Sequence, residues 1–154
     1  MNTFYTYETT YGIITIESDG RAITSIKRKS PTEPNGRKIA NKLTDMAATQ
    51  LDEYFKGKRK QFDLPLNLHG TSFQLSVWKA LSDIPYSETR SYKDIATAIG
   101  NPKACRAVGL ANNKNPVWIV VPCHRVIGSN GTLTGYGGGL EMKQRLLDLE
   151  ATKQ

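Results

Sequence analysis

The stretch SYKDIATAIGNPKACRAVGLANN, Ser91 to Asn113, decides the fold. Ser91 with Asp94 three residues later forms a capping-box pattern, and the apolar residues that follow recur at helical spacing until Gly100. Pro102 predicts the first position of a second helix, which runs to about Asn112. Two helices joined by so tight a turn indicate a helix-turn-helix.

The second predicted helix has an unusually smooth surface. Helical spacing predicts an inner face of Ala104, Ala107, Val108 and Ala111, and it directs Arg106 outward together with Leu110 and Asn113. A helix that reads the major groove presents long polar side chains, whereas small residues around one arginine suit a shallow contact in the minor groove. The helix alone leaves this interpretation and an ordinary solvated surface helix equally open.

The segments on either side of this stretch predict an α+β protein in two parts. The N-terminal part, residues 1–68, has strand patterns at 3–9, 12–16 and 22–26, a basic loop at 27–37, a helix at 38–56 and an extended segment at 62–68. The C-terminal part, residues 69–154, adds a helix at 72–81, an apolar strand-like run at 117–121 and a final helix at 140–150.

Composition limits the setting in which the protein works. The 154 residues carry a formal net charge of +7, which favours a polyanionic partner. Two cysteines do not make a disulfide framework, so a reducing compartment is favoured. The N-terminus lacks the pattern of a signal peptide, and no apolar run approaches the roughly 20 residues that span a bilayer. We therefore expect a soluble, cytoplasmic protein.

The sequence VPCHRV, Val121 to Val126, raises the possibility of a nucleophile. A thiol reacts as its thiolate, and only a few per cent of an unperturbed thiol is ionised at neutral pH, so Cys123 needs a base. His124 is the candidate base. Neighbouring side chains of an extended chain point to opposite faces, so the sequence predicts a bridging water as readily as direct contact.

An acid that orients the histidine is sought in the final helix. Glu150 shares a face with the apolar Met142, Leu146 and Leu149, so it is predicted to point inward, where a buried carboxylate requires a partner. An imidazole would be such a partner. The alternative is a solvated glutamate at a frayed helix end.

Three other interpretations compete for the cysteines. A buried inert thiol is the usual state of the residue, and we adopt this interpretation for Cys105. A zinc site built from His69, Cys105, Cys123 and His124 lacks the usual C-x-x-C spacing. A cysteine hydrolase would leave the helix-turn-helix and the positive charge unexplained.

Residues 70 to 150 carry a resemblance to a known family. Pro122-Cys123-His124-Arg125-Val126 is similar to the active-site motif of the O6-alkylguanine-DNA alkyltransferases, also called methylated-DNA–protein-cysteine methyltransferases. Further motifs of this family occur in the same order: GTSFQ (70–74), VW (77–78), IPY (84–86), ETRSY (88–92), RAVG (106–109), NP (115–116) and GYGGGL (135–140). Residues before 70 are similar only in the order of strands and helix.

The resemblance implies a fold and a reaction. It implies an RNase H-like N-terminal domain, followed by a winged helix-turn-helix domain in which Cys123 takes the alkyl group permanently. His124 would act as base through a water, with Glu150 as its orienting acid. Tyr92 would donate a proton or hydrogen bond to the leaving guanine, and Asn115 would brace the segment that carries the cysteine.

The resemblance also implies a DNA-binding surface and an alkyl pocket. Arg106 would fill the gap left by a nucleotide extruded through the minor groove, and the predicted DNA-binding set is Arg106, Ala107, Gly109, Arg125 and Ser91. The predicted pocket is Tyr136, Gly137, Val126 and Trp118. Gly137 stands where the family often has serine, and Trp118 stands where it often has proline, which puts the range of alkyl groups in doubt.

The expected partner is double-stranded DNA that carries O6-alkylguanine, and the sequence leaves open O4-alkylthymine as a further substrate. Because a thioether product is stable, no cofactor is expected, and no metal and no membrane partner are expected. We expect a monomer, with cooperative binding along DNA left open. Two alternatives are a lesion-binding sensor without transfer activity and a winged-helix transcription regulator. Known sensors lack the active cysteine, and known regulators carry further metal-binding domains.

Overall fold

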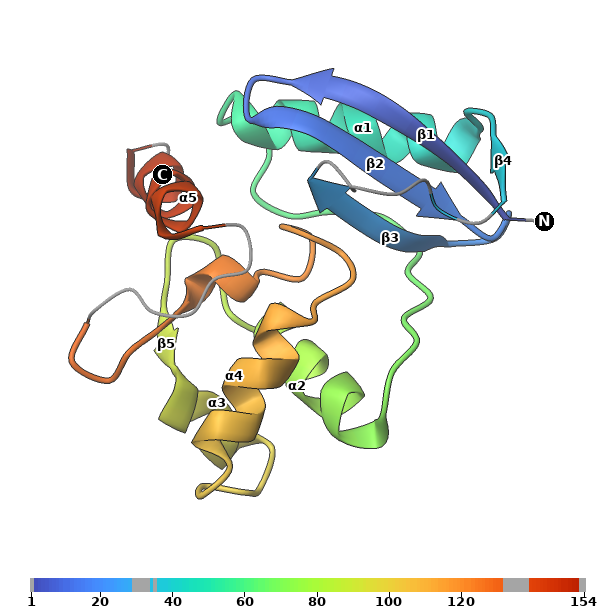
Figure 1. Cartoon of the computed structure of the whole chain (residues 1–154). Coiled ribbons are helices and arrows are strands. Elements are labelled where there is room, and N and C mark those ends of the chain that lie inside the picture. The colour runs from blue at the N-terminus through green and yellow to red at the C-terminus, as the bar shows by residue number, and fades with distance from the viewer. Residues whose placement is uncertain (1, 29–33, 35, 132–138, 153–154) are drawn as a thin grey trace. The chain divides into compact units, whose positions relative to one another are not determined.

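The computed structural model describes residues 2–28, 34, 36–131 and 139–152 (Figure 1). The chain divides into two compact units. The N-terminal unit comprises Met1–His69 together with Pro116–Trp118, and the C-terminal unit comprises Gly70–Asn115 together with Ile119–Gln154. The predicted α+β class is confirmed, because the first unit holds a sheet and the second is mainly helical.

A four-stranded sheet forms the body of the N-terminal unit. Its strands are β1 (Thr3–Thr9), β2 (Gly12–Ser18), β3 (Ile23–Arg28) and β4 (Arg37–Lys38), in the order β3-β2-β1-β4. The three long strands pair antiparallel, as their sequence patterns predict, and β4 pairs parallel to β1. Isoleucines of β2 and β3 are buried with apolar residues of the helix α1, and this forms the core of the unit.

Helix α1 spans Lys42–Phe55 and begins four residues later than predicted. Asn41 caps it, with its side chain accepting from the backbone N–H of Thr44, while the Thr44 hydroxyl accepts from the N–H of Asn41. The predicted helix start at Lys38 is wrong because Arg37 and Lys38 form β4. Backbone pairing with β1 therefore takes precedence over helix propensity at these two positions.

The apolar run 117–121 does not form the continuous strand that its composition predicts. Val117 pairs with Ile26 of β3, and the backbone of Ile26 bonds to Pro116 O at 2.9 Å and to Trp118 N at 3.0 Å. Ile119 has a φ of 72°, a left-handed conformation that is rare for a β-branched residue. Ile119 therefore turns the chain, and the run ends as a strand after two residues.

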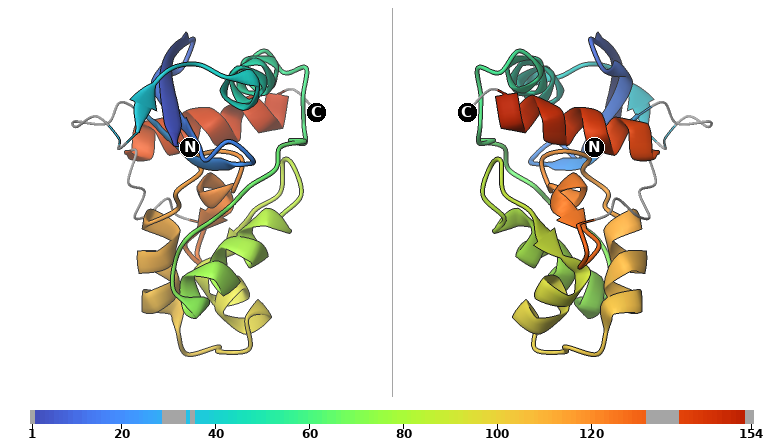
Figure 2. Two further views of the ribbon diagram at one scale, coloured as in Figure 1. Left: turned by 90° about the vertical axis from the view of Figure 1, so that its right-hand side faces the viewer. Right: turned by 90° about the vertical axis from the view of Figure 1, so that its left-hand side faces the viewer.

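The C-terminal unit contains the predicted helix-turn-helix. Its elements are α2 (Ser72–Ser82), β5 (Arg90–Ser91), α3 (Tyr92–Ala98), α4 (Cys105–Asn113), a 3₁₀ turn (Cys123–Arg125), β6 (Val126–Ile127) and α5 (Leu140–Thr152). Strands β5 and β6 pair parallel. Helices α2, α3 and α4 pack together, as both views in Figure 2 show. The capping box of Ser91 and Asp94 is confirmed, and Thr71 and Gln74 form a second one at α2.

Helix α4 differs from its prediction in its start and in one face. It begins at Cys105, because residues 101–104 form a turn, so Pro102 is not its first residue. Val108 and Ala111 are buried as predicted, but Ala107 is exposed. The exposed side of α4 therefore carries Ala107 beside Arg106 and Leu110, and the Leu110 side chain is 63% exposed.

Among the residues that the structure describes, no helix combines the length and the apolar character needed to cross a bilayer.

Candidate active site

The cysteine motif adopts a 3₁₀ turn, so the predicted extended backbone is wrong at this point. The N–H of Cys123 donates to Val121 O at 2.8 Å, and the N–H of Arg125 donates to Pro122 O at 3.0 Å. With three residues per turn, successive side chains leave such a helix in directions about 120° apart. Cys123, His124 and Arg125 therefore face three different surroundings, and all three are buried.

Two asparagines from the end of α4 hold the backbone of this turn. Asn115 Nδ2 donates to Val121 O at 2.7 Å, which is the kind of bracing contact that the family resemblance implies for Asn115. Asn112 Nδ2 donates to Cys123 O at 3.4 Å, and sequence reasoning missed this residue. A polar amide directly after the buried Ala111 was the signal available. These bonds tie the backbone around Cys123 to the helix-turn-helix.

His124 and Glu150 form a buried pair. His124 Nε2 lies 2.6 Å from Glu150 Oε2, and the two side chains are 0% and 1% exposed. A carboxylate can only accept, so Nε2 carries the proton, and Nδ1 is then the nitrogen with the lone pair. The structure therefore brings together His124, the candidate base, and Glu150, which helical spacing predicts to point inward.

Glu150 accepts several further hydrogen bonds. Arg125 donates through Nε to Oε1 at 2.8 Å and through Nη2 to Oε2 at 2.9 Å, and the backbone N–H of Ser87 donates to Oε1 at 3.0 Å. Burial alone would raise the pKa of Glu150, but the hydrogen bonds from His124 and Arg125 and the positive charge of Arg125 outweigh it. The pKa of Glu150 is held well below its usual range, so the carboxylate is ionised.

Arg125 lies inside the protein, which corrects one sequence-based prediction. It is 6% exposed, its Nη1 donates to Ile84 O at 2.8 Å, and its guanidinium lies over the Tyr86 ring at 5.6 Å. A guanidinium engaged with Glu150 and a carbonyl inside the unit is not presented to a phosphate. We therefore remove Arg125 from the DNA-binding set.

The surroundings of His124 favour a neutral imidazole. Complete burial lowers the pKa of His124, and the charges of Arg125 and Lys143 lower it further, while Glu150 acts in the opposite direction. The pKa lies below the ordinary value of 6.5. At neutral pH the ring is therefore able to accept a proton.

Lys143 is a residue of this site that sequence reasoning missed. Its side chain is 0% exposed, its pKa is lowered to about 8 by burial, and the neighbouring Cys123 acts against that shift. Its Nζ lies 5.9 Å from the centre of the Tyr92 ring. The signal was in the pattern of α5, because Lys143 falls on the buried stripe with Leu146 and Glu150. A buried lysine is rare and points to a function.

Tyr92 stands at the junction of these groups with the helix-turn-helix. It is the first residue of α3 and is half-buried, and Ser91 directly before it accepts from the N–H of Asp94. A Cβ placed on Gly109 of α4 would lie 3.8 Å from the Tyr92 ring, which is ordinary van der Waals contact. The ring therefore lies between the exposed helix α4 and the buried Lys143.

The remaining predicted residues fall into two groups. On α4, Arg106 and Ala107 are exposed and Gly109 is half-buried, so their predicted contact with DNA stays a prediction. Of the predicted pocket, Tyr136 and Gly137 lie outside the described residues, and Val126 is fully buried in β6.

Trp118 belongs to the N-terminal unit, which does not favour its predicted place in the alkyl pocket. Its ring packs against Phe55 of α1 at 6.2 Å, and Arg28 lies over it at 5.8 Å.

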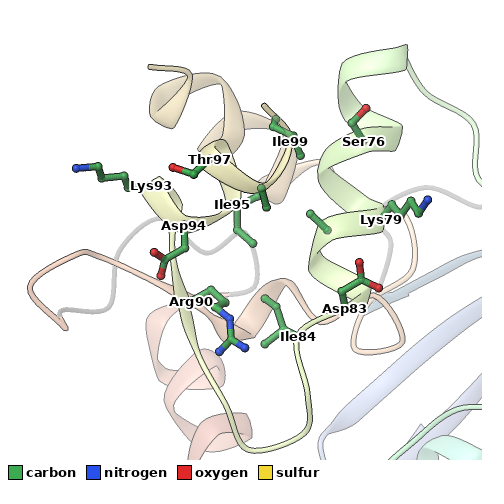
Figure 3. A pocket seen from close by; sticks show the side chains of 12 residues that line it. Ser76, Lys79, Asp83, Ile84, Arg90, Lys93, Asp94, Ile95, Thr97 and Ile99 are labelled. Carbon is green, nitrogen blue, oxygen red and sulfur yellow. The ribbon is translucent and has the colours of Figure 1, made fainter. Parts of the chain in front are cut away.

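A groove of about 1060 Å³ lies between α2 and α3 (Figure 3). Its floor is apolar, with Ile84 and Ile95, and charged side chains stand at its edges, among them Lys79, Arg90 and Asp94. Its lining includes neither cysteine and neither histidine, so the groove is not assigned as the alkyl pocket. Within the described part of the chain, no group of three or more His, Cys, Asp or Glu side chains is arranged to hold a metal ion.

Comparison with known proteins supports the family resemblance along most of the chain. Residues 72–152 match the profile of the 6-O-methylguanine DNA methyltransferase DNA-binding domain, and residues 3–68 match the ribonuclease-like domain of the same enzymes. A methylated-DNA–protein-cysteine methyltransferase of Mycobacterium tuberculosis is 47% identical over 97% of this chain and 93% of its own length. One of Methanosarcina barkeri is 64% identical over 68% of this chain, which spans 66% of that relative, just under two thirds of its length.

Solved structures agree with the sequence comparison. The crystal structure of Mycobacterium tuberculosis OGT in complex with DNA superimposes with a TM-score of 0.92 at 46% identity, covering 98% of this chain and 94% of that one. With both halves of the chain matched in sequence and in fold, this protein belongs to the 6-O-methylguanine DNA methyltransferase family.

Proposed function

We propose that this protein repairs DNA by moving the alkyl group of O6-alkylguanine onto its own Cys123. The observation that carries the proposal is the buried His124–Glu150 pair beside Cys123, in a chain that belongs to this family. A carbon–sulfur bond forms at Sγ while the carbon–O6 bond breaks. The thioether is stable, so each molecule acts once and the reaction needs no cofactor.

His124 acts as the base for the thiol. Its Nε2–H is held by Glu150, so Nδ1 accepts the thiol proton through a bridging water. Glu150 stabilises the imidazolium that forms. Tyr92 then donates its hydroxyl proton to the guanine as O6 loses its alkyl carbon, so that the base leaves neutral. The phenolate left on Tyr92 is balanced by the proton that His124 has taken from the thiol.

Lys143 adds positive charge near the sulfur. An ammonium buried beside Cys123 stabilises the thiolate relative to the thiol, and the electrostatic coupling between the two groups supports this role. Its Nζ also lies 5.9 Å from the centre of the Tyr92 ring. Lys143 thereby links the nucleophile to the proton donor.

Helix α4 supplies the contact with double-stranded DNA. The alkyl carbon faces the interior of a duplex, so the nucleotide must be extruded, which costs a few kcal/mol. We propose that the exposed Arg106 enters from the minor groove and fills the gap, while Ala107 and Gly109 allow close approach and Ser91 contacts the backbone. Tyr136, Gly137 and Val126 remain the proposed lining of the alkyl pocket.

We propose the same division of labour that the sequence indicates. Residues 69–154 carry DNA binding and alkyl transfer, and residues 1–68 form the accompanying sheet domain. The protein works in the cytoplasm as a monomer on alkylated duplex DNA.

The proposal is tested by intact-protein mass spectrometry after incubation with a duplex that contains O6-methylguanine. The expected result is a gain of one methyl group per molecule, lost in Cys123→Ser and retained in Cys105→Ser. An unchanged mass for the folded wild-type protein would contradict the proposal, and binding to the lesion without a mass gain would identify a sensor instead.

A further inference from the structure

The buried carboxylate of Glu150 is held by more than its histidine. Two of its donors come from the guanidinium of Arg125, which forks onto both carboxylate oxygens at 2.8 and 2.9 Å. A bidentate guanidinium fixes the plane of a carboxylate as well as its position. The oxygen that accepts from His124 is therefore oriented by Arg125.

The loop before β5 supplies the next donor and anchors the guanidinium. The N–H of Ser87 donates to Glu150 Oε1 at 3.0 Å, and Ile84 O accepts from Arg125 Nη1 at 2.8 Å. Ser87 has a φ of 71°, a left-handed conformation that costs energy for a residue with a Cβ. Strain of this kind persists where the surrounding contacts require it, and here it directs an N–H at Glu150.

Electrostatics define what such an arrangement does to the histidine. The described charged groups that act on His124 are Glu150 and Lys143 from α5 and Arg125 from the 3₁₀ turn, with Cys123 beside it. If no cation lay beside it, a buried carboxylate 2.6 Å from Nε2 would stabilise the imidazolium. Nδ1 would then already carry a proton and could not accept one from the thiol. A positive charge on the same carboxylate offsets that effect. The imidazole then stays neutral without losing its hydrogen bond.

We propose that Arg125 is a positioning residue for the histidine: its positive charge beside Glu150 keeps His124 neutral at neutral pH, and its fork onto both oxygens of Glu150 holds the Nε2–H tautomer. The proposal deepens the proposed function, because it rests on His124 acting as the base. It assigns to the arginine of the cysteine motif an internal role in place of the DNA contact that the sequence suggested.

The chain offers a direct test because it contains only two histidines. His69 is exposed and lies in the N-terminal unit, so its ring signals serve as an internal reference. Proton–carbon NMR titration of the rings, assigned with His69→Gln, gives the pKa of His124. We expect Arg125→Gln to raise the pKa of His124 by at least about one unit, while the ring signals of His69 follow the same titration curve as in the wild type.

Two control variants separate charge from packing. Arg125→Lys keeps the positive charge, so it is expected to leave the pKa of His124 within about half a unit of the wild-type value. Ser87→Gly keeps the N–H while it relieves the backbone strain, and it should also leave that pKa unchanged. An unchanged or lowered His124 pKa in folded Arg125→Gln would overturn the proposal.

A measurement on the wild-type protein tests the proposal even if Arg125→Gln does not fold. Nitrogen-15 shifts of His124 at pH 7 are expected to show a protonated Nε2 and an unprotonated Nδ1. An imidazolium or the opposite tautomer would overturn the proposal. Neither NMR result depends on alkyl transfer. A negative result in the repair assay alone would therefore contradict the proposed function but not the role of Arg125.

The rate of methyl transfer provides a readout that a purely structural role would not produce. In Arg125→Gln, we expect a loss of at least about tenfold at pH 7, with partial recovery as the pH rises above the raised pKa of His124. An equal loss at every pH would contradict the positioning role.

Discussion

Nε2 of His124 lies 2.6 Å from Oε2 of Glu150, although 26 positions separate the two residues in sequence. The histidine belongs to the 3₁₀ turn and the glutamate to the end of α5. The last helix therefore contributes part of the candidate site as well as apolar residues to the core.

Glu150→Gln tests this relationship. It removes the charge that would stabilise the imidazolium, so methyl transfer at pH 7 should slow by about 10²-fold. It also leaves the guanidinium of Arg125 uncompensated, which should cost on the order of 3 kcal/mol of stability. Stopped-flow transfer and urea unfolding measure the two effects. Glu141→Gln at the exposed start of α5 is the control, and equal behaviour of the two variants would exclude Glu150 from the site.

Stability should fall with acid in two steps. The folded pKa values of His124 and Glu150 both lie below their ordinary 6.5 and 4.5, so the unfolded chain binds more protons in the acid range. The contribution of these two groups to the free energy of unfolding is fully present above pH 6.5. It decreases below pH 6.5, where His124 is protonated more readily in the unfolded chain, and decreases further below pH 4.5, where the same holds for Glu150. Urea unfolding between pH 8 and pH 3 measures this. In Glu150→Gln, the loss of stability below pH 4.5 should be absent. If the free energy of unfolding fell equally steeply with pH in both proteins below pH 4.5, the assignment of this loss to Glu150 would be contradicted.

Lys143→Met should make the protein more stable and less reactive. The folded pKa of Lys143 is lowered to about 8, so the buried charge opposes folding below that pH, and the penalty disappears as pH rises toward 10.5. At pH 7 the variant should gain on the order of 1–3 kcal/mol, while methyl transfer slows because the thiolate loses its neighbouring charge. Thermal unfolding and single-turnover rates check both parts. A variant with wild-type rates would show that Lys143 does not act on Cys123.

Arg106→Ala should separate DNA handling from chemistry. Repair of duplex DNA is expected to fall by at least tenfold, whereas reaction with free O6-alkylguanine should stay close to wild type, because the gap-filling role exists only in a duplex. Arg145→Ala on the exposed face of α5 removes an equal charge elsewhere and serves as the control. Equal losses on the duplex and the free base would refute the proposed role of Arg106.

The sequence predicted those features that depend on local pattern. The capping box at Ser91, the strands of the first hairpin and the inward face of α5 all follow from the spacing of residues along one element. The inward direction of Glu150 could therefore be predicted, and the family motif identified Cys123 and His124 as its companions.

Features set by tertiary contacts could not be predicted in this way. The turn at Ile119 breaks an apolar run because the preceding residues pair with β3 within the N-terminal unit, far away in sequence, which local propensity does not encode. Arg125 was assigned to the DNA-binding set by the family resemblance, and only the fold brings Glu150 within reach of its side chain. Lys143 was overlooked although it lies on the buried stripe of α5, because lysine is rarely buried.

The central claim is that Cys123 accepts the alkyl carbon, and peptide mapping after one reaction tests it most directly. Protein incubated with an O6-methylguanine duplex and digested with protease should carry one added methyl group on the peptide that contains Cys123, and none on the peptide that contains Cys105. A methyl group found on Cys105 or on any other residue, with Cys123 unmodified, would contradict the account.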